Sequence, residues 1–129
     1  MTIGKINSYR DLKVWQLAID ISVACYEVTK NLPREEMYGL SSQIRRASAS
    51  VAANIAEGYG RENRGSFVQF LRIAQGSLKE LETHLIITGR VSLVELSVLN
   101  ELLDRCEENG RMLGALIRAV QRKKADERV

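Results

Sequence analysis

The sequence has few aromatic residues, prolines and cysteines, and each shortage argues against a class of protein. Aromatic residues make up 5% of the 129 residues and Pro33 is the only proline, which disfavours a β-sandwich with many turns. The two cysteines, Cys25 and Cys106, lack the paired spacing of a zinc ribbon or a disulfide scaffold. Hydrophobic residues make up 45% of the chain, which argues against disorder and suits a single all-α domain.

Histidine is scarcer still, since His84 is the only one. A di-iron helical bundle needs a Glu-x-x-His motif, but Leu81 stands three residues before His84. Glu80 stands four residues before it, which leaves open a half-site shared between subunits as well as a plain surface or interface histidine. No serine or cysteine has the local signature of a catalytic nucleophile. We therefore predict that the protein is not an enzyme and has no metal and no cofactor.

Long apolar runs are also absent. The opening residues MTIGKINSYRD lack the apolar segment of a signal peptide. No stretch approaches the roughly 18 uncharged apolar residues of a membrane-spanning helix. We therefore expect a cytoplasmic protein with reduced cysteines and no membrane partner.

Four long segments do have the periodicity of amphipathic helices. We expect them over about 12–30, 37–58, 66–88 and 92–122, with a flexible tail over 123–129. The connectors are short, which makes successive helices antiparallel. The sequence thus predicts one domain, residues 1–129, folded as an up-down-up-down antiparallel four-helix bundle.

Two capping boxes are predicted at helix starts. Ser66 with Gln69, and Ser92 with Glu95, have the three-residue spacing in which each side chain bonds the other residue's backbone amide. The third helix is therefore expected to begin near Ser66 and the fourth near Ser92.

The first segment has more apolar surface than one bundle core needs. On a helical wheel, Trp15, Ile19 and Tyr26 lie on one face, and Ile21 and Cys25 lie on an adjoining apolar face. Left in water, these faces would form an unusually large apolar patch. We therefore predict a homo-oligomer.

The second segment contains SQIRRASASVAANIAEG (42–58), with two adjacent arginines among alanines and serines. A helical wheel divides it into an apolar core face, a face of small residues and a polar stripe. The predicted oligomer or packing seam combines the small-residue face with the first segment and contains Trp15, Tyr26, Arg45, Ala49, Ala52 and Ala56. The polar stripe contains Gln43, Arg46, Ser50, Asn54 and Glu57.

Three roles are open for the arginine pair. In a packing seam, the aliphatic part of Arg45 would cover alanines while its guanidinium finds a carboxylate or a carbonyl group. Alternatively, Arg45 or Arg46 would bind phosphate, for which the planar guanidinium is suited. The third role is catalytic. Because the two residues lie about 100° apart on the wheel, we expect them to differ.

Basic residues gather in the loop after the second segment and near the C-terminus, although the net charge is only +3. The candidate nucleic-acid-binding residues are Arg61, Arg64, Arg118, Arg122, Lys123 and Lys124. A plain interhelical turn is the alternative for the glycine-rich loop, which lacks the Lys-Ser or Lys-Thr of a phosphate-binding loop. Stacking aromatics are not interleaved with these residues, so we expect weak, sequence-tolerant and salt-sensitive binding.

The pieces YGLSSQIRRASASVAANIAEGYGR and SFVQFLRIAQGSLKELETHL resemble the bacterial four-helix-bundle family of the 23S ribosomal RNA intervening-sequence proteins. The same family includes the accessory variability determinant of diversity-generating retroelements. The similarity extends over nearly the whole chain, and its most specific parts are Gln43 to Arg46 and Asn54 to Gly58. The resemblance implies a ring-like, pentameric homo-oligomer. In the retroelement branch it also implies nucleic acid and a reverse transcriptase as partners, although the charge of this chain is modest.

Two functions remain as hypotheses. The first is a non-enzymatic, homo-oligomeric module that binds RNA or DNA through its basic loop and tail, within a ribonucleoprotein. The second is a protein-interaction scaffold with no nucleic-acid role, whose apolar and small-residue faces serve self-assembly and a protein partner. Salt dependence separates them, because phosphate contacts weaken steeply with ionic strength while apolar interfaces respond little.

Overall fold

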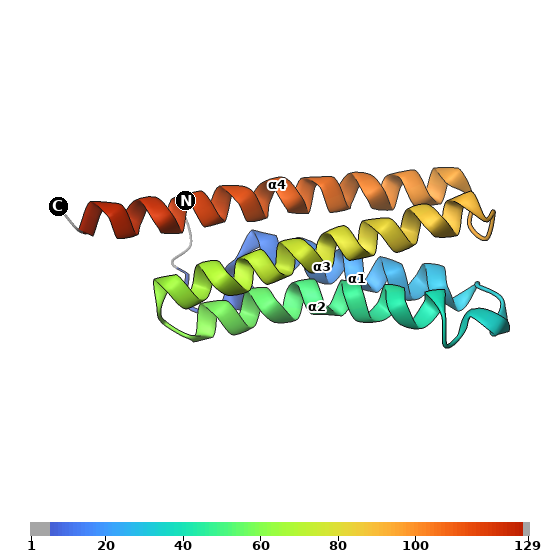
Figure 1. The fold of residues 1–129 in the computed structure, drawn as a ribbon, viewed down its shortest axis with the longest axis horizontal. Helices are drawn as coiled ribbons and strands as arrows, with labels where there is room; N and C mark the ends of the chain where they lie inside the picture. Colours follow the sequence, from blue (N-terminus) through green and yellow to red (C-terminus); the bar gives the residue numbers. More distant parts are fainter. Residues whose placement is uncertain (1–5, 128–129) are drawn as a thin grey trace.

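Four long α-helices packed side by side make up the protein (Figure 1). The computed structural model describes residues 6–127, with side chains described as far as Arg122. The helices alternate in direction and are α1 (Lys13–Lys30), α2 (Leu40–Gly60), α3 (Arg64–Arg90) and α4 (Leu96–Glu127). Short 3-10 helices, η1 (Tyr9–Asp11) and η2 (Arg34–Glu36), precede α1 and α2. Residues 6–127 contain no β-strand, and the predicted all-α, up-down-up-down four-helix bundle is confirmed.

The core lies where the apolar stripes of the four helices meet. Its largest side chains are at most 2% exposed and include Ile21, Ile44, Ile55, Leu71, Leu78, Leu81, Leu85 and Leu113. Burying one such side chain contributes about 1.5–3 kcal/mol. A polar contact also joins the first and last helices, because Nδ2 of the fully buried Asn109 in α4 donates to the carbonyl oxygen of Val14 in α1 at 3.0 Å.

Two predicted helix starts are wrong by a few residues. Helix α3 begins at Arg64, because Asn63 takes the capping position and its side chain accepts from the Ser66 amide at 2.9 Å. Helix α4 begins at Leu96 and not near Ser92, whose φ of 62° is a left-handed conformation that a capping residue does not adopt. The amide of Ser92 instead donates to Gly89 and closes the end of α3.

The boundaries of α2 and α4 also differ from those predicted. Helix α2 begins at Leu40 instead of residue 37, because η2 and a turn occupy the connection from α1. Helix α4 continues to Glu127, through most of the segment that was predicted to be a flexible tail. The residues after Arg122 are mostly good helix formers, and neither glycine nor proline is among them.

Apolar side chains also remain on the outside of the single chain. On α1, Val23 is 58% exposed and Tyr26 is 43% exposed, and on α3, Ile73 is 46% exposed. Of the residues from which the sequence predicts a homo-oligomer, Tyr26 is exposed while Ile21 and Cys25 are buried in the core. The homo-oligomer stays a prediction. No helix within residues 6–127 combines the length and apolarity needed to cross a membrane.

Candidate functional site

The small-residue face of α2 packs against α1 of the same chain. Ser48 is 1% exposed and Ala52 is 5% exposed, and the hydroxyl oxygens of Ser48 and Ser22 lie 3.0 Å apart. Ala52 therefore belongs to a seam inside the bundle. Ala49 is exposed and Ala56 is half-buried, so these two alanines lie closer to the surface.

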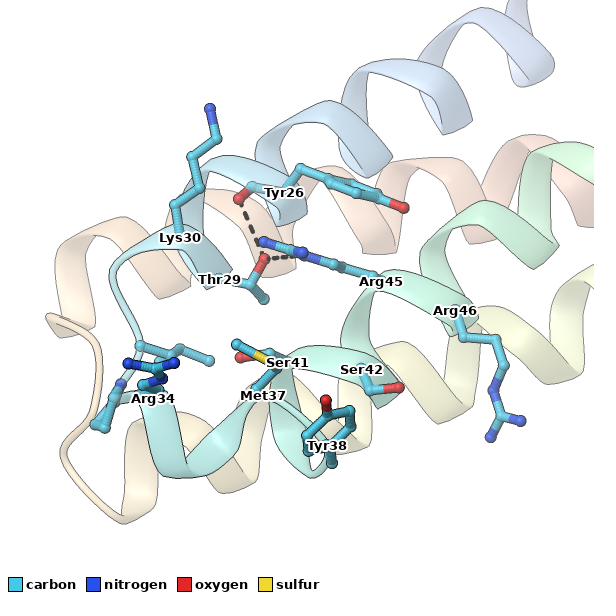
Figure 2. A pocket seen from close by; sticks show the side chains of 12 residues that line it. Tyr26, Thr29, Lys30, Arg34, Met37, Tyr38, Ser41, Ser42, Arg45 and Arg46 are labelled. Atoms are coloured by element: carbon cyan, nitrogen blue, oxygen red, sulfur yellow. Dashed lines mark hydrogen bonds between the residues drawn. The ribbon is translucent and has the colours of Figure 1, made fainter.

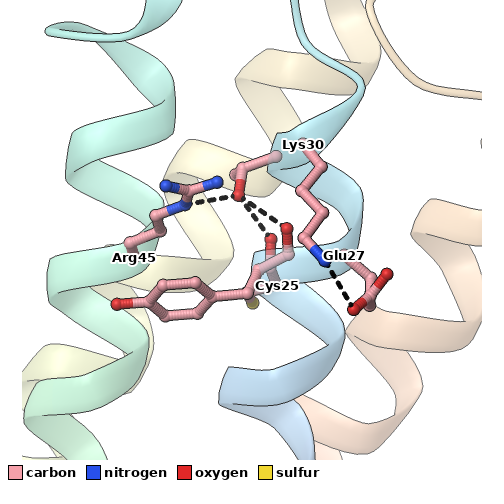
Figure 3. Close-up of polar contacts among 6 residues, drawn as sticks. Cys25, Glu27, Lys30 and Arg45 are labelled. Atoms are coloured by element: carbon pink, nitrogen blue, oxygen red, sulfur yellow. Dashed lines mark hydrogen bonds and ion pairs between the residues drawn. The ribbon is translucent and has the colours of Figure 1, made fainter.

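Arg45 is the polar centre of this seam (Figure 3). Its Nε donates to Oγ1 of Thr29 in α1 at 2.8 Å, and its guanidinium lies 4.8 Å from the centre of the Tyr26 ring. Oγ1 of Thr29 lies 2.9 Å from the carbonyl oxygen of Cys25, so α1 holds the hydroxyl in place. Among the described residues no carboxylate pairs with Arg45. A hydroxyl and an aromatic ring thus take the place of the carboxylate or carbonyl group that the packing interpretation predicts.

Trp15, the remaining residue of the predicted seam, lies near the start of α1. Its ring meets that of Tyr9 edge to face, with the ring centres 5.1 Å apart. The side chain is half-buried and packs against the core. Trp15 therefore contributes to packing within the chain and leaves only part of its surface for another copy.

The predicted polar stripe of α2 lies beside α3 and is internally bonded. Ser50 and Ser77 join the two helices, with 2.9 Å between their hydroxyl oxygens, and Nδ2 of Asn54 donates to the Ser50 carbonyl oxygen at 2.8 Å. Arg46 donates to Oε1 of Gln43 at 2.8 Å. The last residue of the stripe, Glu57, pairs with Arg61 at 3.5 Å. The stripe therefore has a structural role along much of its length.

The two predicted basic clusters lie at the same end of the bundle (Figure 1). The α2–α3 connection carries Arg61 and Arg64, and the C-terminal part of α4 carries Arg118 and Arg122. Arg61 also lies 5.1 Å from the centre of the Phe70 ring, and Arg64 is half-buried. Arg118 and Arg122 are exposed. We name these four arginines the basic end; the side chains of Lys123 and Lys124, also predicted to bind, lie outside the described residues.

A cavity of about 790 Å³ lies at the opposite end, where the chain passes from α1 to α2 (Figure 2). We name it the α1–α2 pocket. Four basic side chains line it, namely Lys30, Arg34, Arg45 and Arg46, and none of its described lining residues is acidic. Tyr26 and Tyr38 also line it, and Tyr38 is 91% exposed. The arrangement can bind an anion.

The sequence predicts no pocket at this place. It puts Tyr26 and Arg45 in a packing seam and Arg46 in a polar stripe, with phosphate binding as one open role for the arginines, and it does not single out Lys30, Arg34 or Tyr38. These three residues lie at the end of α1 and in the connection to α2, where no helical periodicity relates them to the arginine pair. The sequence does contain one local indication of a basic site, because Lys30 and Arg34 lie close to Pro33, between the first and second helices.

The described residues offer little for catalysis. Burial raises the pKa of the Cys25 and Cys106 thiols to about 12, so neither is a thiolate at neutral pH. Nε2 of His84 lies 3.7 Å from Oε2 of Glu80, but no group of three or more histidine, cysteine or acidic side chains is placed to hold a metal ion among the residues described. What the two ends share is a group of basic side chains, the kind of surface that suits anions.

Comparisons with known proteins point to one family. A family model described as "23S rRNA-intervening sequence protein" matches residues 10–115. A solved structure from Bacteroides thetaiotaomicron, described as a protein of unknown function from the S23 ribosomal protein family, is similar in fold, with a TM-score of 0.76 and 24% identity. That match covers 81% of this chain and 95% of the other. A comparison with curated proteins gave no match.

Proposed function

The chain belongs to the 23S rRNA-intervening sequence protein family, and we propose that it acts without catalysis, as a helical-bundle module that binds RNA or DNA through the basic end. The observation that carries the proposal is the antiparallel fold, which puts Arg61 and Arg64 at the same end as Arg118 and Arg122. Arginines fit phosphate groups in two-point contacts, and a surface of them binds the backbone of a nucleic acid without reading its sequence.

Binding by one chain is expected to be weak. Arg61 already pairs with Glu57, and four arginines supply few phosphate contacts. Assembly into a homo-oligomer, a pentamer by the family resemblance, would present several copies of the basic end to one nucleic acid and raise the overall affinity. Exposed apolar side chains such as Val23 and Ile73 support such an assembly. We propose that the homo-oligomer and the nucleic acid it binds are parts of a ribonucleoprotein.

A second function, a protein-interaction scaffold with no nucleic-acid role, is supported by the same apolar side chains. The resemblance to the accessory variability determinant extends this alternative to a protein partner such as a reverse transcriptase. On this alternative, the basic end would only keep the protein soluble, and removing its charges would leave partner binding unchanged.

Filter binding with single-stranded and structured RNA tests the proposal. We expect Arg118→Ala/Arg122→Ala to weaken binding of both RNAs alike, because phosphate contacts do not depend on sequence. The control is Arg105→Ala/Arg111→Ala, which removes the same charge from the middle of α4, where both arginines pair with glutamates of their own helix. Equal binding by the two double variants would contradict a role for the C-terminal part of the basic end.

A further inference from the structure

We propose that the α1–α2 pocket is a second ligand site, which binds a nucleoside phosphate. The connection from α1 to α2, which lines the pocket, lies at the opposite end of the bundle from the basic end (Figure 1), so this inference does not rest on the proposed function. Four observations point to this ligand: the charge of the pocket, the held guanidinium of Arg45, the start of α2, and an exposed aromatic ring.

The charge of the pocket has one sign. Lys30, Arg34, Arg45 and Arg46 line it, and its described lining includes no acidic residue. Among the described residues, Lys30 is the one of the four with an ionic partner, Glu27 at 3.3 Å, and both side chains of that pair are more than 60% exposed, so the pair is weak. A concave surface with charges of one sign concentrates the electrostatic potential. The pocket therefore attracts anions although the whole chain has a net charge of only +3.

Arg45 is held in position before any ligand arrives. Its Nε donates a hydrogen bond to Thr29, and its guanidinium carbon lies over the Tyr26 ring. These two contacts fix the guanidinium at the pocket wall (Figure 2). Nε is the Arg45 nitrogen with a hydrogen-bond partner among the described residues, so the two terminal nitrogens keep their donors. Two parallel N–H groups match two oxygens of a phosphate, and a fixed fork loses little entropy on binding.

The start of α2 adds backbone donors to the same wall. Its capping residue, Gly39, supplies no side-chain acceptor; the Glu36 carboxylate lies beside this helix start and, among the described residues, accepts from the Leu40 amide at 3.4 Å. Ser41 and Ser42 line the pocket from the first turn of α2, where amides have no partner within the helix. The dipole of α2 favours a bound anion at this position, and the four basic side chains favour one too.

The size of the pocket and Tyr38 identify what carries the phosphate. A volume of about 790 Å³ is too large for a bare phosphate and is typical of pockets for small organic ligands. The Tyr38 ring is 91% exposed and lies on the segment that leads into α2, among the residues that line the pocket (Figure 2). An exposed ring beside basic groups stacks with nucleobases. The ligand is therefore a nucleoside phosphate, either a free nucleotide or the phosphorylated end of an RNA strand.

Calorimetric titration with adenosine monophosphate and with inorganic phosphate tests the inference. We expect Arg34→Ala/Arg46→Ala to weaken binding of both ligands by at least about tenfold, since each loses charge-assisted contacts. Tyr38→Ala should weaken only the nucleotide, because inorganic phosphate has no base to stack. Arg118→Ala/Arg122→Ala should bind both ligands as the unaltered protein does, which separates this site from the basic end. These variants leave the Arg45 contacts in the α1–α2 seam intact.

Two results would overturn the inference: no binding of either ligand to the unaltered protein at about 1 mM, or equal affinities for the unaltered protein and Arg34→Ala/Arg46→Ala. If Tyr38→Ala weakened both ligands equally, stacking would be excluded and with it the nucleoside. RNA oligonucleotides with and without a terminal phosphate distinguish the two sources. A preference for the phosphorylated strand that is lost in Arg34→Ala/Arg46→Ala identifies an RNA end, and equal binding of the two strands identifies the free nucleotide.

Discussion

Arg45 and Arg46 are neighbours in sequence with different surroundings. Arg45 is half-buried between α1 and α2, where Thr29 accepts from it and the Tyr26 ring lies under it. Arg46 is exposed, and Gln43 of the same helix is its partner. A side chain that joins two helices stabilises the fold, whereas one that bonds only its own helix contributes little. The difference follows from the 100° step of the helix.

We predict that Arg45→Ala lowers the free energy of unfolding by about 1–2 kcal/mol, the combined value of one hydrogen bond and a partly exposed cation–π contact. Arg46→Ala should change it by less than about 0.5 kcal/mol, as is usual for exposed polar contacts. Urea unfolding measures both values. Equal destabilisation by the two substitutions would contradict the assignment of Arg45 to the seam.

The sequence separates these two arginines but does not identify their partners. A helical wheel gives the face on which a residue lies, so the divergence of Arg45 and Arg46 could be predicted. Thr29 could not be recognised as the partner of Arg45, because the contact depends on the relative shift of α1 and α2. The α1–α2 pocket could not be predicted either, since Arg34 and Tyr38 lie in the connection between the helices, where no periodicity relates them to Arg45.

At the scale of the elements, close approach of the helices depends on glycine at particular positions. A β-carbon added to Gly58 near the end of α2 would lie 2.7 Å from the β-carbon of Phe70 in α3, which is closer than such atoms come. A β-carbon added to Gly76, in the middle of α3, would meet no atom within 4 Å apart from its two chain neighbours and the nearby backbone of its own helix. The first glycine allows α2 and α3 to touch, while the second only weakens its helix.

We predict opposite effects for substitution of these two glycines. Gly58→Ala should destabilise the protein by about 1–3 kcal/mol, because the helices must shift to admit the methyl group. Gly76→Ala should stabilise it by roughly 0.5–1 kcal/mol, the gain in helix propensity. Thermal unfolding followed by circular dichroism compares the two. A melting temperature raised by Gly58→Ala would show that α2 and α3 are not held together at this point.

The number, order and direction of the helices follow from the sequence, whereas their ends do so less well. Apolar periodicity extends over many residues and tolerates local exceptions. A helix start depends on one or two residues, and Asn63 competes with Ser66 for the capping position of α3. Ser92 matched a capping pattern but adopts a left-handed conformation. Local patterns therefore fail where the connection between helices requires an unusual backbone conformation.

At the scale of the whole molecule, one chain buries its core but leaves apolar side chains outside. Val23 and Tyr26 on α1, and Ile73 on α3, are all more than 40% exposed. Scattered apolar residues are normal on a protein surface, but neighbouring ones on one helix favour association. The wide apolar surface of α1 could be predicted from the sequence. The number of copies could not, because it depends on the angle between the surfaces that meet.

We predict that the protein is a homo-oligomer in solution, with a mass of at least twice the 14.5 kDa of one chain. Val23→Glu should reduce that mass without loss of helix content, because it places a charge on the apolar face of α1 outside the core. Asp20→Asn, an exposed neighbour on the same helix, changes the charge by one unit and is the control. Light scattering measures the masses. A monomer of the unaltered protein at micromolar concentration would contradict the prediction.

The most direct test of the proposed function is the salt dependence of RNA binding by the unaltered protein. Each phosphate contact with single-stranded RNA contributes about −0.7 to the slope of the logarithm of the binding constant against the logarithm of the salt concentration. If several copies of the basic end bind one strand, the slope should be steeper than about −2. A slope near zero, or no binding at any salt concentration, would contradict nucleic-acid binding and favour the scaffold function.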